Sequence, residues 1–233
     1  MSAAASLARG VKDQEVRPAR GGRGRPHQLP SGRHGLQRSF VVQNQRERIL
    51  SAVAVAAAEL GFAEMTVEAV IERAGVSRRT FYDNFRNKEE AFLAAYEAAV
   101  RQQAKTVQLA YLNETTMRGR LRAGLDAYMR FMANEPEFAR MCMIEVLAAG
   151  PRAIERRNDA MRMFAKIIEQ NIRELVPGCT VAPLAAETIV GGIYEVVYNR
   201  VFAGRTAELP GLVDDLLATI LMVTAGRYGS DPQ

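Results

Sequence analysis

The chain contains no tryptophan, two cysteines and two histidines, and these shortages argue against several kinds of functional site. Cys142 and Cys179 are far apart and lack metal-ligand spacing, so we interpret them as core thiols of a cytoplasmic protein. His27 and His34 both lie in a glycine-rich N-terminal segment, and the sequence shows neither a catalytic constellation nor a phosphate-binding glycine loop. We therefore expect no enzyme activity, no metal site and no bound cofactor.

Long apolar runs are also missing from the sequence. A membrane-spanning helix needs about 18 or more consecutive apolar residues, and no such run occurs, so we expect no contact with a membrane. The N-terminus has no continuous apolar segment of the kind that a secretory signal requires. The hydrophobic content of 48% and the charged content of 24% are typical of a globular protein in the cytoplasm.

The positive charge is concentrated at one end of the chain. Residues 1–39 hold eight Arg or Lys against two Asp or Glu, which gives a net charge of +6. Residues 40–90 hold seven against eight, a net charge of −1, and residues 91–233 are neutral with sixteen of each sign. A basic segment of this kind indicates a polyanion or an anionic surface nearby.

Residues 1–39 form a basic arm with many glycines and prolines and few large apolar residues. Such a segment buries too little surface to offset its ordering entropy, so we predict that it is disordered when free. Arg23 and Arg25, in the sequence Arg-Gly-Arg-Pro, resemble the core of an AT-hook, which inserts arginines into narrow A·T-rich minor grooves. The alternative is a solvated basic tail that makes no groove contact.

The stretch from Thr66 to Lys88 has the pattern of two short helices joined by a tight turn. Gly75 can end the first helix in the left-handed conformation, and Ser77 is a preferred N-cap for the second. The second helix then has an apolar back and a cationic, hydroxyl-bearing front, as the second helix of a helix-turn-helix requires. The apolar positions are Val67, Val70, Ile71 and Ala74 in the first helix and Phe81 and Phe85 in the second.

This stretch resembles the TetR family of bacterial transcription regulators over roughly residues 42–95. The resemblance implies a three-helix DNA-binding domain over residues 40–90, joined by a long fourth helix to a helical effector-binding and dimerisation domain over residues 91–233. The matching residues are Thr66-Val67, Ala74-Gly75-Val76-Ser77, Thr80-Phe81-Tyr82, Phe85 and Lys88-Glu89.

Roles in DNA binding are implied residue by residue. Ser77, Arg78, Arg79 and Thr80 would face the major groove, where Arg can bind guanine bidentately. Three further residues, Thr66, Tyr82 and Lys88, would contact phosphates. Asn84 departs from the family pattern and could either pair with adenine or hydrogen-bond the end of its own helix. Tyr82 could instead belong to the core, and the two arginines could be ordinary surface charges.

Everything beyond residue 90 is predicted to be helical, so the fold class is all-α. The long fourth helix continues towards Leu109. The predicted helices that follow it cover residues 117–133, 136–149, 151–176, 183–203 and 209–227. Six of the ten methionines lie between Met129 and Met163, and flexible methionines suit a cavity for apolar guests. An ordinary core is the alternative. The predicted pocket residues are Tyr128, Met129, Met132, Met141, Glu145 and Phe164.

Glu145 stands among apolar helical neighbours and must be paired, hydrated or close to a cavity. It could orient a ligand, or it could pair with an arginine of the next helix, such as Arg156 or Arg157. The last two predicted helices carry more apolar residues than one face can bury, which predicts a homodimer through a four-helix bundle. The predicted interface residues are Ile189, Gly192, Ile193, Val196, Leu216 and Ile220.

Together these patterns predict a homodimeric regulator that binds a double-stranded operator, most simply a repressor released by a small apolar or amphipathic effector. The repressor mechanism is implied by the resemblance alone. A ligand-independent regulator and a protein-interaction module with a nonspecific basic arm are the alternatives. The effector, the operator and the target genes are not encoded in any pattern found in the sequence.

Overall fold

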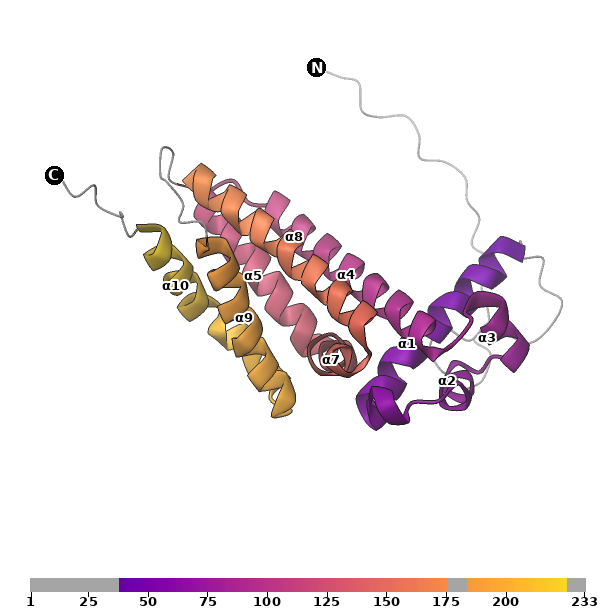
Figure 1. Ribbon diagram of the computed structural model, residues 1–233. Coiled ribbons are helices and arrows are strands. Elements are labelled where there is room, and N and C mark those ends of the chain that lie inside the picture. Colours follow the sequence, from indigo (N-terminus) through magenta and orange to yellow (C-terminus); the bar gives the residue numbers. More distant parts are fainter. Residues whose placement is uncertain (1–37, 176–183, 226–233) are drawn as a thin grey trace, which may run out of the picture. The chain divides into compact units, whose positions relative to one another are not determined.

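The computed structural model describes residues 38–175 and 184–225, and every regular element in these two ranges is helical (Figure 1). The predicted all-α class is confirmed. The predicted arm, with Arg23 and Arg25, lies outside the described residues except for its last two positions. Within the described ranges, no helix combines the length and apolarity that crossing a membrane requires.

The helix-turn-helix is formed by α1 (Arg38–Glu64), α2 (Val67–Ala74) and α3 (Arg78–Asn84). The predicted turn residues behave as expected: Gly75 has φ 60° and ψ 41°, the left-handed conformation, and Ser77 accepts a hydrogen bond from the backbone N–H of Thr80. A Cβ atom at position 75 would also come within 2.7 Å of Arg48 Nη2, so a larger residue would displace the end of that arginine as well as strain the backbone.

Helix α1 bends sharply near its C-terminal end. Gly61 has φ 78° and ψ 153°, which no helix accommodates, and Phe62 then turns back towards the core. The rings of Phe62 and Phe92 meet edge to face with centroids 5.0 Å apart. The chain between α1 and α2 is therefore anchored against the long helix that begins at Lys88.

A bundle of long helices follows the helix-turn-helix. Helix α4 (Lys88–Leu112) contacts α5 (Met117–Asn134) and α8 (Pro151–Leu175), and the three run alongside one another in Figure 1. Asn87 caps α4 by accepting a hydrogen bond from Glu90 N at 2.8 Å. The Glu90 carboxylate accepts a hydrogen bond from the N–H of Arg86 and not from that of Asn87, so the reciprocal half of a capping box is not formed.

The helix predicted over residues 136–149 is interrupted by a wider turn. It consists of α6 (Pro136–Arg140), a π-helical segment η1 (Met141–Glu145) and α7 (Val146–Ala148), and Gly150 with φ 91° ends it. A π-helical turn inserts one extra residue per turn and rotates the side chains that follow. Sequence periodicity did not reveal this insertion.

The last helices are α9 (Ala185–Phe202), the 3-10 helix η2 (Thr206–Leu212) and α10 (Val213–Ala225). The predicted start of the last α-helix at Leu209 is wrong, because η2 occupies that stretch and carries Pro210 inside it. Leu209 is fully buried, so the 3-10 turn plugs the core between α5, α9 and α10.

Two buried clusters hold these elements together. The first contains the core of the helix-turn-helix and also Met141, Val146 and Ala153 from the segments beyond α5. The second gathers residues of α5, α8, α9, η2 and α10 around Met129 and Val197. Because the first cluster crosses residue 90, the helix-turn-helix packs directly on α6, η1 and α7. The boundary at residue 90 remains a prediction.

Candidate DNA-binding face and ligand cavity

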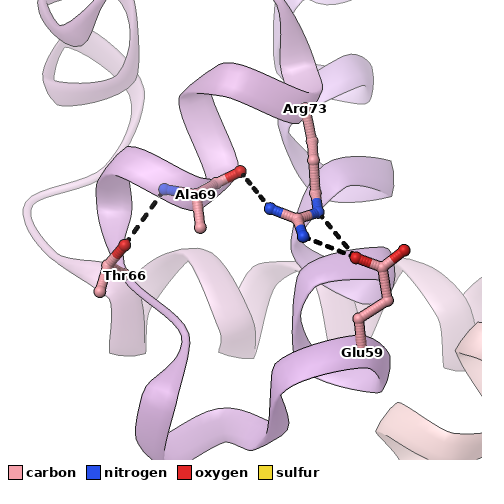
Figure 2. A network of polar contacts seen from close by, with 4 residues as sticks. All are labelled: Glu59, Thr66, Ala69 and Arg73. Carbon is pink, nitrogen blue, oxygen red and sulfur yellow. Dashed lines mark hydrogen bonds and ion pairs between the residues drawn. The ribbon is translucent and has the colours of Figure 1, made fainter.

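Side-chain hydrogen bonds hold helix α2 at its start and near its end (Figure 2). Thr66 Oγ1 accepts a hydrogen bond from Ala69 N at 3.1 Å, as expected of an N-cap. Arg73 donates to the carbonyl oxygen of Ala69 at 3.0 Å and, through Nη2, to Glu59 Oε2 at 2.6 Å. The arginine thereby links α2 to α1, which holds the platform behind α3.

The front of α3 is exposed and its back is buried. Phe81 and Phe85 are almost completely buried, whereas the Arg79 side chain is 90% exposed. Tyr82 is 48% exposed, so the structure does not support the alternative that this tyrosine belongs to the core. Ser77 and Arg78 are likewise exposed, and Thr80 is half-buried.

The polar side chains of this face interact with one another in the free protein. Arg78 forms an ion pair with Glu68 of α2, and Arg79 lies 3.9 Å from Asp83. The hydroxyls of Ser77 and Thr80 are 2.9 Å apart. These pairs are exposed and weak, so phosphate or base contacts can replace them at little cost.

Asn84 takes the local alternative of the two predicted for it. Its Nδ2 donates to the carbonyl oxygen of Thr80 at 2.8 Å, and the side chain is half-buried. Its own carbonyl oxygen receives Arg46 Nη1 at 3.5 Å. The Asn84 side chain therefore hydrogen-bonds the C-terminal end of its own helix α3 and does not extend from the recognition face.

Lys88 has an internal role that the sequence did not suggest. Its Nζ donates to the carbonyl oxygens of Phe62, Ala63 and Met65 at 3.1, 3.0 and 3.0 Å, which engages all three of its protons. It also lies 4.9 Å from the centroid of the Phe62 ring. The predicted phosphate contact thus has no free donor here, and Lys88 instead closes the chain between α1 and α2.

Arg48 has a similar function at the next junction. It donates to the carbonyl oxygen of Ala74 and, at 2.9 Å, to that of Gly75, the last carbonyls around the end of α2. A cation at the C-terminal end of a helix satisfies unpaired carbonyls and interacts favourably with the helix dipole. The sequence signal was available only as an arginine in α1, because its partner lies in a distant segment.

A cavity of about 580 Å³ lies among α4, α5, α8 and α9, within the range typical of small-molecule sites. Three of the predicted pocket residues, Tyr128, Met132 and Phe164, line it, and the Tyr128 and Phe164 rings are 6.3 Å apart. The prediction is wrong for Met129 and Met141, which are fully buried in the two core clusters and do not line the cavity. The polar lining residues are Gln103, Gln108, Arg120, Arg157, Gln170 and Asn171, with tyrosines at 96, 111, 128 and 194.

Glu145 is buried at the contact with the helix-turn-helix, not in the cavity. Its Oε2 accepts a hydrogen bond from the backbone N–H of Phe62 at 2.8 Å, and its Oε1 lies 3.4 Å from Arg140 Nε. The predicted pairing with an arginine is correct in kind, but the partner is Arg140 rather than Arg156 or Arg157. The extra residue of the π-helical segment η1 brings position 145 onto the side that faces Gly61 and Phe62.

The predicted dimer residues fall into two groups. Ile189 and Ile220 are buried in the chain's own core, so they have little surface to offer a second subunit. Gly192 is exposed, while Ile193, Val196 and Leu216 are half-buried. Phe202 and Met222, which the sequence pattern did not single out, are 65% and 68% exposed on α9 and α10.

The fold and the face of α3 define a helix-turn-helix regulator with an all-α partner domain that encloses a cavity. Residues 49–95 match the family described as bacterial regulatory proteins, tetR family. Over these residues, which include the helix-turn-helix, the chain is similar to the TetR family of bacterial regulatory proteins.

Several relatives share parts of this architecture. The HTH-type transcriptional activator FasR of Mycolicibacterium smegmatis is 28% identical over 127 residues, which cover 54% of this chain and 52% of FasR. The chain thus spans about half the length of that relative. The fatty acid degradation regulator FadR from Bacillus halodurans has a TM-score of 0.69 at 18% identity, covering 79% of this chain and 96% of that one. FadR from Bacillus subtilis in complex with stearoyl-CoA has a TM-score of 0.65 at 20% identity, covering 77% and 98%. At these identities the two structures establish the fold.

Proposed function

We propose that the chain is a dimeric, sequence-specific transcription regulator in the cytoplasm. In this proposal it is a repressor that an amphipathic ligand with an acyl chain releases from a near-palindromic operator. The observation that carries this proposal is the exposed row of Ser77, Arg78 and Arg79 on a helix whose back is buried in a helix-turn-helix. Major-groove recognition needs this arrangement, because base edges are reached by side chains from a rigidly mounted helix.

The ligand part of the proposal rests on the cavity and on the relatives. A mostly apolar cavity that opens among long helices suits a chain-like guest, and one structural relative, FadR from Bacillus subtilis, was crystallised in complex with stearoyl-CoA. Binding would change DNA affinity only if the ligand prefers one arrangement of the helix-turn-helix over another. The direct packing of η1 and α7 on the helix-turn-helix provides a route for that preference.

The sign of regulation is a separate part of the proposal. We propose repression because the contact between the cavity region and the helix-turn-helix can remove a binding-competent arrangement when a ligand enters. One relative is named an activator, so both signs occur among proteins similar to this chain. A reporter fused to the bound promoter would rise on ligand addition for a repressor and fall for an activator.

The test of DNA binding uses fragmented genomic DNA from the source organism and the full-length protein. Captured fragments are sequenced, and the same capture is repeated with an Arg78→Ala, Arg79→Ala double variant. Enrichment of a few fragments by the wild type, lost in the double variant, supports the proposal. The protein-interaction alternative predicts salt-sensitive capture of DNA without sequence preference, unchanged by the two substitutions.

A further inference from the structure

Among the described residues that line the cavity, two are arginines and none is an aspartate or glutamate. Arg120 is satisfied within the protein, since its Nε donates to the carbonyl oxygen of Glu114 at 3.0 Å and its guanidinium lies 5.4 Å from the Tyr111 ring centroid. A cation that lines a cavity normally requires an anionic or hydrogen-bonding partner. The wall as a whole therefore favours an anionic guest.

Arg157 lacks an anionic partner in the part of the chain that the structure describes. It forms no ion pair there, and its Nε is buried without a hydrogen-bond acceptor. Its Nη1 donates to Asn158 Oδ1 at 3.0 Å, and its guanidinium carbon lies 4.1 Å from the centroid of the Tyr194 ring. The stacked ring fixes the plane of the guanidinium, so its remaining donors are held in place beside the cavity.

Two phenols complete this group of donors, which we call the Arg157 cluster (Tyr96, Tyr128 and Arg157). Both tyrosines line the same cavity, and their hydroxyls hydrogen-bond to none of the described residues. Burial raises the pKa of each phenol, and the neighbouring Cys142 and Tyr194 add to the effect, while Arg157 lowers the pKa of Tyr96. The hydroxyls are therefore neutral donors near pH 7. The three residues lie on α4, α5 and α8 and line the same cavity.

We propose that the cavity binds a free monocarboxylate with a long apolar tail, and that Arg157, Tyr96 and Tyr128 hold its carboxylate. This inference rests on the proposed ligand-binding function and deepens it. The two-donor edge of a guanidinium matches the two oxygens of a carboxylate, and charge-assisted hydrogen bonds of this kind are about twice as strong as neutral ones. One cation and two phenols balance one negative charge, which an alcohol or a coenzyme A thioester does not carry at its carbonyl end.

The tail has a continuous apolar wall available beyond the cluster. Leu125, Phe164 and Ile168 line the cavity together with Val107 and Leu121. Burial of methylene groups contributes about 0.8 kcal/mol each, so chain length sets the affinity and the head group sets the selectivity. The expected ligand is therefore chosen by its carboxylate and not by coenzyme A.

Isothermal titration of the full-length protein with dodecanoate, 1-dodecanol and dodecanoyl-coenzyme A tests this assignment. The wild type should bind dodecanoate most tightly. The Arg157→Gln variant should bind dodecanoate roughly 10- to 100-fold more weakly and bind 1-dodecanol as the wild type does. Arg162→Gln is the matched control, because Arg162 is 62% exposed on the same helix and pairs with Asp159. It should leave all three affinities unchanged.

A second variant removes the hydroxyls without changing the packing volume. The double substitution Tyr96→Phe, Tyr128→Phe should weaken dodecanoate binding in the same direction, and it also serves if Arg157→Gln fails to fold. Absence of dodecanoate binding to the wild type, tighter binding of the thioester, or full dodecanoate affinity in both variants would overturn the assignment. Operator binding is measured on the same samples. Its absence, with the carboxylate preference intact, would remove the regulator proposal and leave the binding site standing.

Discussion

At the scale of single residues, the cations of the helix-turn-helix divide into those used inside the fold and those free to meet DNA. Residues 40–90 carry a net charge of −1, so any general positive field must come from the basic arm and not from the helix-turn-helix. Arg48 and Lys88 close backbone carbonyls near the ends of helices, while Arg78 and Arg79 remain on the surface. Affinity must therefore depend on a few placed side chains.

Arg79→Ala should weaken binding to the specific operator by about 1–3 kcal/mol, because a bidentate contact to a base edge would be lost. Fluorescence anisotropy with the operator and with a scrambled duplex measures the loss at fixed salt. Arg101→Ala, an exposed cation on α4 paired with Glu97, is the control and should bind as the wild type does. Equal operator affinity of the Arg79→Ala variant would contradict the assignment of α3 as the recognition helix.

Lys88→Met should lower the free energy of unfolding by about 1–3 kcal/mol, because it removes charge-assisted hydrogen bonds to three carbonyl oxygens. Urea unfolding followed by circular dichroism measures this change. Arg86→Met, at a neighbouring side chain that is 84% exposed, should cost under about 1 kcal/mol. If Lys88 acts on a phosphate instead, stability stays constant and the salt dependence of operator binding falls by about one charge.

At the scale of elements, the helix ends and turns that depend on neighbouring residues could be predicted from the sequence. The cap at Ser77 and the turn at Gly75 were recognisable because each depends on residues within three or four positions. The partners of Glu145 were not recognisable, because they depend on the π-helical segment and on a contact with Phe62, 83 residues away in the sequence.

The cavity lining was likewise predictable only in part, because it depends on contacts between distant segments. Helical periodicity finds the apolar face of a helix, but it does not separate residues beside an empty space from residues in a packed core. Met132 and Met129 are both buried and lie on one helix, yet only Met132 lines the cavity. The Arg157 cluster joins three separate helices, so only the assembled fold reveals it.

The contact between η1 and the helix-turn-helix should depend on the Glu145 carboxylate. Glu145→Ala leaves the Phe62 N–H without its acceptor and should reduce stability by about 1–3 kcal/mol, whereas Glu145→Gln keeps an acceptor oxygen and should cost less. Thermal unfolding measures both, with the exposed Glu137→Ala as the control. Because Glu145 does not line the cavity, ligand affinity of the folded Glu145→Gln variant should stay near the wild-type value. A tenfold loss would return Glu145 to the ligand site.

At the scale of the whole molecule, two operator half-sites require two recognition helices and therefore two chains. Phe202 and Met222 are exposed apolar side chains on α9 and α10, and Phe202 stacks on Tyr198 at 6.0 Å between centroids. Burying such side chains between subunits would account for the apolar excess of these helices.

Phe202→Asp should shift the protein from a dimer to a monomer at micromolar concentration, because a carboxylate would be buried without a partner at the interface. Light scattering coupled to size-exclusion chromatography gives the mass. Leu109→Asp, at a side chain that is 56% exposed on α4, should leave the dimer intact. A wild-type protein that is already monomeric would contradict the proposed assembly.

Selection of bound sequences from a random duplex pool by the full-length protein is the strongest test of whether a pair of α3 helices reads DNA. We predict an inverted repeat whose half-sites lie about 34–36 Å apart, one helical turn, as two α3 helices in successive major grooves require. It also predicts that the Arg78→Ala, Arg79→Ala double variant enriches no motif. Recovery of no motif by the wild type, or of the same motif by the double variant, would contradict the claim that α3 reads DNA.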